Sequence, residues 1–251
     1  MRKFRWPGGF KGAVSLTFDD GMQSQLSLGI PLIERFGFRG TFYINPRDNY
    51  RERLKPWKEI ADRGHEIGNH STAHPCSCNF LGDPEGRGLE NMTLQDIRSD
   101  VVEAHSRIRQ IIPNASRTFA YPCYQTSVGR GLNKISYVPV IAEIFLAARA
   151  GGERGYANSP LACDLHELWS WSADRMSYEE MIGLTIRAVS EGRWAVFTIH
   201  GINEGHLPTS DHDLTGFLRF LDTHRDEIWV APVVEVAEFI IEERRELGLT
   251  S

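Results

Sequence analysis

The chain has no long apolar run and no excess of positive charge. Its 251 residues carry 28 basic and 33 acidic side chains, a net charge of -5, so no basic field is available to attract a phosphate backbone. Nucleic acid is therefore not an expected partner. The most apolar stretch, Tyr137–Ala150, contains Pro139 and Glu143 and is shorter than the roughly 20 residues of a transmembrane helix. We therefore expect no membrane partner either.

Cysteine is also scarce, and the sequence starts without an export signal. Four cysteines, at positions 76, 78, 123 and 163, are too few for a disulfide scaffold. Met1–Lys11 contains basic residues but lacks the apolar core of a secretory signal. We expect free thiols and a cytoplasmic location, or secretion if a leader has been removed. The hydrophobic fraction of 41% is that of an ordinary globular protein.

Short apolar runs alternate with helical patterns along the whole chain. The runs predict strands at Val14–Phe18, Gly40–Pro46, His65–Gly68, Thr118–Tyr121, His166–Trp171, Trp194–Ile199 and Ile228–Val230. Helical spacing predicts helices at Pro31–Gly37, Trp57–Arg63, Thr93–Ile111, Ile141–Ala148, Ser177–Gly192, Leu214–Leu221 and from Pro232 onward. Without a linker or repeat, this alternation favours one α/β domain over residues 1–251, a parallel-stranded barrel rather than an open sheet.

Two acidic residues, Asp19 and Asp20, follow the first predicted strand. The carboxyl ends of parallel strands are where α/β folds collect catalytic groups, although Asp-Asp-Gly is also a common turn. After the third predicted strand, His70 and His74 are four residues apart, a spacing that places two imidazoles on one face of a turn. Two nitrogens and a carboxylate oxygen form a typical open metal site that suits zinc, so the pattern indicates a metal hydrolase.

A third histidine, His200, directly follows the predicted strand Trp194–Ile199. Its position at the carboxyl end of a strand suits proton transfer, while a capping or buried structural role is the alternative. His206 and His212 lie in the polar loop that follows and receive no role.

Four motifs, in this order along the chain, resemble those of the polysaccharide deacetylases, carbohydrate esterase family 4, which share a NodB-homology domain. The motifs are Thr17–Gly21, His70–His74, Phe119–Pro122 and Phe197–His200. The resemblance extends from about Val14 to at least His200. It implies a distorted (β/α) barrel, usually of seven strands.

By position, the resemblance implies that Asp20, His70 and His74 bind a divalent metal, first of all Zn²⁺, with Co²⁺, Mn²⁺ or Ni²⁺ as alternatives. Asp19 would be the catalytic base that deprotonates the attacking water. His200 would be the acid that protonates the departing amine.

The same resemblance suggests residues that contact the substrate. Phe197 and Ile199 match apolar positions around the acetyl methyl group, and the backbone near Tyr121 would help to hold the oxyanion. Trp171 and Trp169 could stack on a sugar, although core packing is the commoner role of such residues.

Two positions depart from the family pattern. Ala120 stands where an arginine often pairs with the catalytic base, so another residue must orient Asp19, and Arg117 is one candidate. The aspartate that tunes the catalytic histidine has no clean match. Asp174, with Trp171 nearby, is the best match for it. By position, Ser177 and Tyr178 would fall on the Asp-Trp pair of the family, and Ser177 is equally well explained as a helix N-cap.

These features predict a deacetylase that acts on an N-acetylated amino sugar or its oligomer. A carbohydrate O-acetyl esterase of the xylan type, or a hydrolase of a small cyclic or linear amide, is the alternative on the same scaffold. A non-catalytic carbohydrate-binding protein is a third, less favoured hypothesis, because the five metal and catalytic positions are intact. The sequence does not indicate the oligomeric state.

Overall fold

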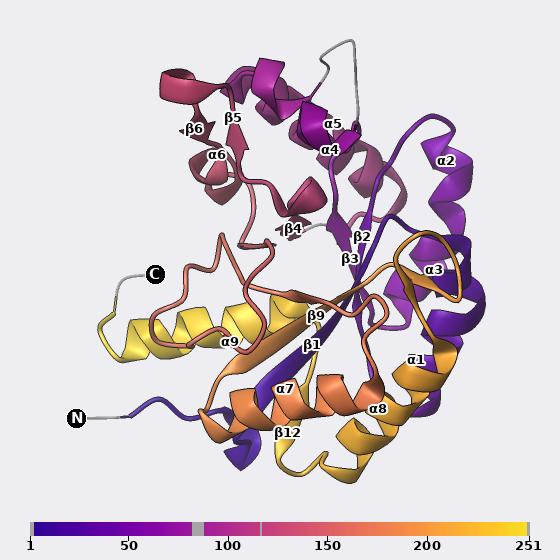
Figure 1. Cartoon of the computed structure of the whole chain (residues 1–251), viewed down its shortest axis with the longest axis vertical. Helices are drawn as coiled ribbons and strands as arrows, with labels where there is room; N and C mark the ends of the chain where they lie inside the picture. The colour runs from indigo at the N-terminus through magenta and orange to yellow at the C-terminus, as the bar shows by residue number, and fades with distance from the viewer. Residues whose placement is uncertain (1–2, 82–87, 116, 250–251) are drawn as a thin grey trace.

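The computed structural model describes residues 3–81, 88–115 and 117–249 (Figure 1). Its centre is a curled sheet made of β1 (Gly12–Asp19), β2 (Thr41–Ile44), β3 (Glu66–Asn69), β4 (Thr118–Ala120), β7 (Ala147–Arg149), β8 (Trp171–Ser172), β9 (Trp194–Ile199) and β12 (Ile228–Val230). Seven of these strands follow one another in the order β7, β4, β3, β2, β1, β9, β8, all parallel, and β12 pairs alongside β1. Two small pairs lie outside this sheet, β5 (Ser127–Val128) with β6 (Ile135–Ser136) and β10 (Gly201–Ile202) with β11 (Pro208–Thr209).

The helices connect the strands and cover the sheet. They are α1 (Ile30–Arg35), α2 (Tyr50–Arg53), α3 (Lys55–Asp62), α4 (Cys78–Leu81), α5 (Leu94–Ile111), α6 (Val138–Ala142), α7 (Tyr178–Ser190), α8 (Asp211–Thr223) and α9 (Val233–Glu246). Helices α5 and α7 begin with capping boxes at Thr93 and Ser177, which fix the start of each helix. A five-residue π-helix, η2 (Gln25–Gly29), precedes α1.

The two ends of the strand series come together to form a distorted barrel. Arg149 at the end of β7 forms a parallel bridge with Leu168, shortly before β8, and the Ala150 N–H donates to the Leu168 carbonyl at 2.7 Å. The segment before β8 thus lies beside β7 while β8 itself pairs with β9. This arrangement confirms the predicted seven-stranded (β/α) fold.

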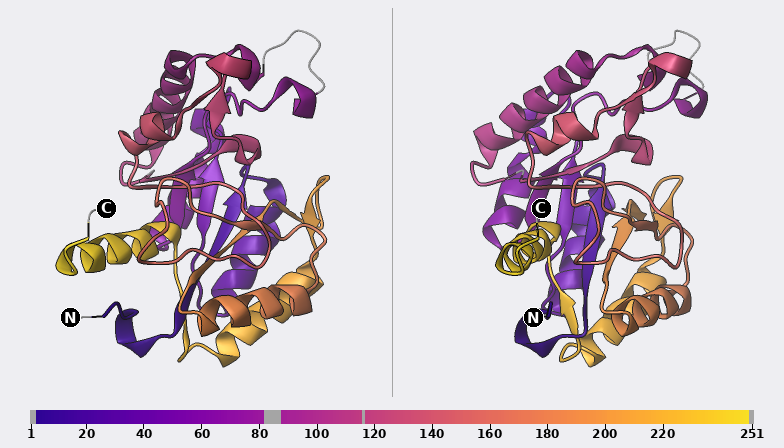
Figure 2. Two further views of the ribbon diagram at one scale, coloured as in Figure 1. Left: turned by 60° about the vertical axis from the view of Figure 1, so that its left-hand side comes forward. Right: turned by 90° about the vertical axis from the view of Figure 1, so that its left-hand side faces the viewer.

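The main apolar core lies between the sheet and its helices. Figure 1 shows β1 and β9 side by side in the middle of the molecule, with α7 and α8 on one side and α9 on the other. Phe197 of β9 contacts Phe217 of α8, with ring centroids 4.9 Å apart. The N-terminal segment and α9 lie on the same side of the molecule (Figure 2). Among the described residues, no helix combines the length and the apolar character needed to cross a bilayer.

One expected helix is wrong, and its place in the fold matters for the site. The pattern Ile141–Ala148 predicts a helix, but α6 already ends at Ala142 and Ala147 begins strand β7. Pairing with β4 decides this: Thr118, Phe119 and Ala120 align with Ala147, Ala148 and Arg149. A fully buried strand and a buried helix have the same apolar composition, so spacing alone does not separate them.

Candidate functional site

The two acidic residues lie at the carboxyl end of β1, the central strand. Asp19 is the last residue of the strand, and its side chain is only 4% exposed. Asp20 has a φ of 73°, in the left-handed region, and its carboxylate remains one-third exposed. The turn therefore separates the environments of two adjacent carboxylates: that of Asp19 is buried, whereas that of Asp20 is partly exposed to solvent.

The two histidines of the predicted metal site converge on these carboxylates. His70 directly follows β3, and its Nε2 lies 3.7 Å from Asp20 Oδ1 and 3.7 Å from Asp19 Oδ2. His74 lies on the next loop, with its Nε2 3.5 Å from Asp20 Oδ1. One ligand atom each from Asp20, His70 and His74 lies within 4.8 Å of the others. The three residues that the sequence motifs singled out are thus brought together.

His70 is oriented by a hydrogen bond to a backbone carbonyl, as metal-binding histidines commonly are. Its Nδ1 lies 2.8 Å from the carbonyl oxygen of Ala120. Because a carbonyl only accepts, Nδ1 must carry the proton, which leaves the lone pair of Nε2 facing Asp20. Asn45 holds the backbone of the same loop, because its Nδ2 donates to the His70 carbonyl at 2.5 Å. Donor types, spacing and tautomer therefore suit a divalent cation.

Asp19 is held by Arg149, a residue that sequence analysis missed. Arg149 Nη2 donates to both carboxylate oxygens of Asp19, at 2.5 and 2.6 Å, and the arginine is completely buried. The rings of Tyr43 and Tyr124 lie 5.3 and 5.5 Å from its guanidinium carbon. Burial raises the pKa of Asp19, but the charges of Arg149, His70 and His200 outweigh it and leave the pKa below its usual value. Asp19 is therefore ionised near neutral pH.

This finding corrects the prediction that Arg117 orients Asp19. Arg117 is more than half exposed and forms an ion pair with Glu238 of α9. It precedes β4 and thus lies at the amino end of that strand, whereas Asp19 lies at the carboxyl end of its own. Arg149, at the carboxyl end of β7, takes the expected role. The signal was present as an arginine within an apolar run, but assigning that run to a helix concealed it.

His200 follows β9, beside the end of β1. Gln25 of η2 joins the two strand ends, since its Nε2 donates to the carbonyls of Asp19, at 2.5 Å, and His200, at 2.9 Å. Burial lowers the pKa of His200, and the charges of Asp19 and Asp20 only partly oppose this. Its Nδ1 is buried and has no hydrogen-bond partner among the described residues.

The role of Asp174 in tuning His200 stays a prediction, and the observed partner of Asp174 is a serine. The Asp174 carboxylate accepts a hydrogen bond from Ser172, two residues earlier, and the pKa of His200 shows no influence of Asp174 among its principal causes. Ser177, the other candidate considered, caps α7. In the described part of the chain, no acidic side chain is bonded to Nδ1 of His200, where the family pattern led us to expect one.

Comparison with known proteins agrees with this geometry. The sequence pattern of the polysaccharide deacetylase family matches residues 7–135, just over half of the chain. The chain belongs to this family. A chitin deacetylase of Arthroderma benhamiae is 24% identical over 135 residues, which are 53% of this chain and 34% of that protein. A gellan lyase of a Bacillus species is 25% identical over 260 residues, which are 93% of this chain and 10% of that protein.

The chain thus spans no more than about a third of the length of these curated relatives. Among solved structures, a family 4 acetyl xylan esterase from Clostridium thermocellum in complex with cobalt has a TM-score of 0.57 and 16% identity. The alignment covers 95% of this chain and 93% of that one. At this level of identity, the likeness shows that the fold is shared.

The four residues expected to contact substrate have packing roles in this family member. Phe197 and Ile199 are completely buried in the main core. Trp171 packs edge-on against Phe197, and its Nε1 donates to the Glu153 carbonyl at 2.9 Å. The Tyr121 hydroxyl donates to the His166 carbonyl at 2.7 Å.

The expected oxyanion donor is also occupied. The backbone N–H of Tyr121 already donates to the Arg149 carbonyl at 3.0 Å, as part of the pairing between these two chain segments. Contact of these residues with substrate stays a prediction, because the structure shows only how they pack.

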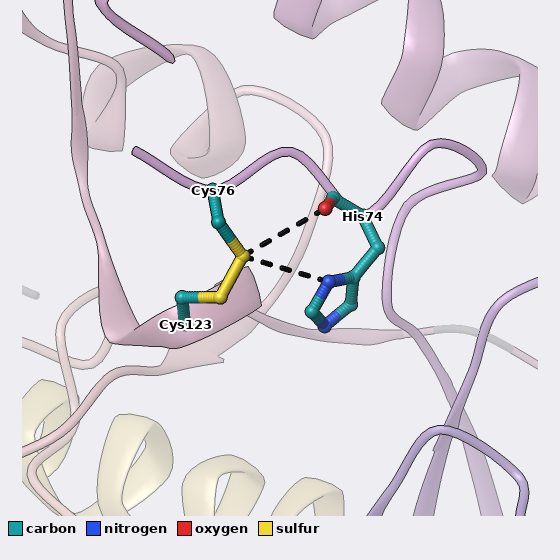
Figure 3. A group of neighbouring side chains, drawn as sticks. All are labelled: His74, Cys76 and Cys123. Carbon is teal, nitrogen blue, oxygen red and sulfur yellow. Dashed lines mark hydrogen bonds between the residues drawn. A yellow bond between two sulfur atoms is a disulfide. The ribbon is translucent and has the colours of Figure 1, made fainter. Parts of the chain in front are cut away.

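The expectation of four free thiols is also wrong. Cys76 and Cys123 form a disulfide, with Cα atoms 5.8 Å apart, while Cys78 and Cys163 are free (Figure 3). The two bonded cysteines are 47 residues apart. Their proximity depends on the neighbouring positions of β3 and β4 in the sheet, which cysteine spacing does not reveal.

Proposed function

We propose that this chain is a metal-dependent deacetylase that hydrolyses the N-acetyl group of an amino sugar or its oligomer, with residues 1–251 as one catalytic domain. The observation that carries the proposal is the convergence of Asp20, His70 and His74 beside the buried, ionised Asp19. Family membership supports an acetylated carbohydrate as substrate, and the related chitin deacetylase supports an N-acetyl group.

Asp20, His70 and His74 would hold the metal, for which Zn²⁺ is the first choice by donor type. The related esterase was solved in complex with a cobalt ion, which supports a transition-metal ion for this family member too. A divalent metal in such a site lowers the pKa of water and polarises an acyl carbonyl.

The remaining steps belong to the side chains around this site. Asp19 takes a proton from the attacking water, and Arg149 fixes its carboxylate in one orientation and keeps it ionised before the reaction. His200, beside Asp19, gives a proton to the leaving nitrogen, because an unprotonated amine is a poor leaving group. Gln25 holds the backbone carbonyls of the base and the acid together.

An O-acetyl esterase is a second candidate, and one observation favours it. Burial lowers the pKa of His200, and no acidic partner is bound to its Nδ1 in the described part of the chain. A histidine that is less readily protonated is better suited to an alcohol leaving group, which needs less protonation than an amine. The likeness to an acetyl xylan esterase points in the same direction.

The test combines metal content with acetate release. Purified protein is analysed for bound metal and then assayed on N-acetylglucosamine oligomers and on acetylated xylan. The wild type should contain one metal per chain and release acetate, whereas His70→Ala/His74→Ala should lose both properties. His224→Ala is the matched control, because this histidine contacts its own helix through the Phe220 carbonyl.

The outcomes separate the proposals. Release from the oligomers alone supports the deacetylase, and release from xylan alone supports the esterase. Bound metal without acetate from either substrate would redirect the search to other amides. Absence of metal from the wild type after incubation with Zn²⁺ would contradict the proposed site.

A further inference from the structure

The Cys76–Cys123 disulfide lies directly behind one of the proposed metal ligands. Figure 3 shows the Cys76 sulfur facing the His74 ring, 3.6 Å from Nδ1, and it lies 3.8 Å from the His74 carbonyl oxygen. The bond joins the loop after β3 to the turn after β4. It therefore connects the chain segment that carries His74 to a second wall of the site.

The two histidine ligands have different support. The Nδ1 of His70 is bound to a backbone carbonyl at 2.8 Å, and its side chain is 2% exposed. The Nδ1 of His74 faces a disulfide sulfur, a weak acceptor, and its side chain is 20% exposed. Within the described residues, His74 Nδ1 thus has no strong hydrogen bond of the kind that normally orients a metal-binding imidazole. On its Nδ1 side, the ring is held by its contact with the disulfide, while the other side faces Asp20 and lies edge-on to His70, with ring centroids 4.8 Å apart.

The backbone on both sides of the disulfide has unfavourable conformations. His74 has a φ of 53°, and Cys123 and Tyr124 have φ values of 54° and 58°, all in the left-handed region. Residues with a Cβ adopt this region at a cost and remain there only when the surroundings enforce it. Cutting the link would therefore allow both segments to relax away from their present positions.

The turn at Cys123 also leads to the catalytic base. Tyr124, the next residue, lies against the guanidinium of Arg149, which holds Asp19. Gly151 leaves the space that the Tyr124 ring needs, because a Cβ there would lie 2.9 Å from Tyr124 Cγ. One covalent bond thus connects the support of His74 with the support of Asp19.

We infer that the Cys76–Cys123 disulfide positions His74 for the metal, so that reduction of this bond weakens metal binding. The inference rests on the proposed role of His74 as a metal ligand. Reduction by a water-soluble trialkylphosphine breaks the S–S bond and oxidises the phosphine to its oxide. The oxide takes the oxygen of one water, and the two hydrogens of that water end on the two sulfur atoms.

The test measures Zn²⁺ affinity of metal-free protein by competition with a chromophoric chelator. The oxidised wild type is compared with phosphine-treated wild type and with Cys76→Ser/Cys123→Ser. Both altered forms should bind Zn²⁺ about ten-fold to a hundred-fold more weakly, the usual effect of losing support behind a metal ligand. Cys78→Ser is the matched control and should bind like the oxidised wild type, because Cys78 is outside the disulfide. Thiol titration should give two free thiols before reduction and four after it.

Each outcome decides the inference. Equal affinity of oxidised and reduced wild type overturns the positioning role while leaving the proposed metal site intact. Tighter binding or a second zinc equivalent in the reduced protein also overturns it, as do four free thiols in air-oxidised protein. Failure of the oxidised wild type to bind Zn²⁺ overturns the proposed function itself. If the double serine variant does not fold, the phosphine-treated wild type gives the same comparison.

Discussion

Two carboxylates are buried at opposite ends of the same sheet, and their surroundings differ. Asp19 ends β1 and is bound by the guanidinium of Arg149. Glu66 begins β3 and is bound by neutral donors: Thr41 Oγ1 at 2.9 Å, Thr118 Oγ1 at 2.5 Å and the backbone N–H of Val234 at 3.0 Å. The pKa of Asp19 is lowered, whereas burial raises the pKa of Glu66 because the hydrogen bonds compensate for it only in part.

The difference indicates a catalytic role for the carboxylate at one end of the sheet and a structural role for the carboxylate at the other. The guanidinium of Arg149 keeps the buried Asp19 ionised although the carboxylate is shielded from solvent. A general base must be ionised before it can accept a proton. Neutral donors instead connect Glu66 to β2, β4 and the first turn of α9, so this carboxylate ties three elements together. Burial of a carboxylate therefore does not by itself mark a catalytic group, and the charge of its partner separates the two roles.

The largest effect is expected for Asp19→Asn, which removes the proposed base. The amide cannot take a proton from water, so we expect acetate release to fall by roughly 10²- to 10⁴-fold. Metal content should remain near one per chain, since Asp20, His70 and His74 are unchanged. Steady-state rates and metal analysis on the same preparation check this expectation. Asp19→Asn protein with full activity would contradict the role of Asp19 as the base.

The next largest effect is expected from Arg149→Met, which removes the cation and keeps most of the volume. Asp19 would then be buried without the guanidinium that donates to both of its oxygens, so the free energy of unfolding should fall by about 3–5 kcal/mol. Asp19→Asn/Arg149→Met should recover most of this loss but no activity, because both charges are then absent. Urea unfolding of the two single variants and the double variant completes the cycle. Additive losses would show that the two charges do not stabilise each other.

Arg149 also shows how much of the fold and of the site could be predicted from the sequence. The strand ends with Asp19, His70 and His200 were predictable, because their motifs directly follow well-marked strands. Arg149 was not, because β7 is three residues long and is defined by its pairing with β4 rather than by its own pattern. The Cys76–Cys123 disulfide likewise depends on the order of strands in space. Local sequence patterns were enough to predict single strands and the motifs that follow them. Contacts between segments that are distant in sequence, such as Arg149 with Asp19 and Cys76 with Cys123, were visible only in the structure.

Replacing the other buried carboxylate, with Glu66→Gln, should have a smaller and different effect. The amide offers one acceptor oxygen where the carboxylate offers two, so one of the donors around Glu66 loses its acceptor. We therefore expect the free energy of unfolding to fall by about 1–3 kcal/mol and the activity to remain nearly unchanged. Denaturant unfolding and acetate release measure the two quantities. A loss of activity comparable to that of Asp19→Asn would mean that the two ends of the sheet are not functionally distinct.

The pH dependence of stability should distinguish the two carboxylates by sign. The lowered pKa of Asp19 means that its contribution is present above its unfolded value of 3.8 and is lost as the pH falls through the still lower folded value. The raised pKa of Glu66 has the opposite effect, because its contribution is complete below 4.5 and is lost as the pH rises through the higher folded value. Wild type should therefore lose stability relative to Glu66→Gln as the pH rises above 4.5. Unfolding free energies of both proteins across this range check the sign, and a gap that widens with rising pH would contradict it.

The smallest effect is expected for Arg117→Ala, which separates the arginine predicted from sequence from the one found in the structure. Arg117 and Glu238 are both about half exposed, and exposed ion pairs of this kind contribute about 0.2–1 kcal/mol. Acetate release should stay at the wild-type level, because Arg149 alone donates to Asp19 among the described arginines. Rates and unfolding curves measured beside those of Arg149→Met provide the comparison. The rate for Arg117→Ala could instead drop as much as that for Arg149→Met. The amino end of β4 would then influence Asp19 across the sheet, and the two ends of the sheet would not be functionally independent.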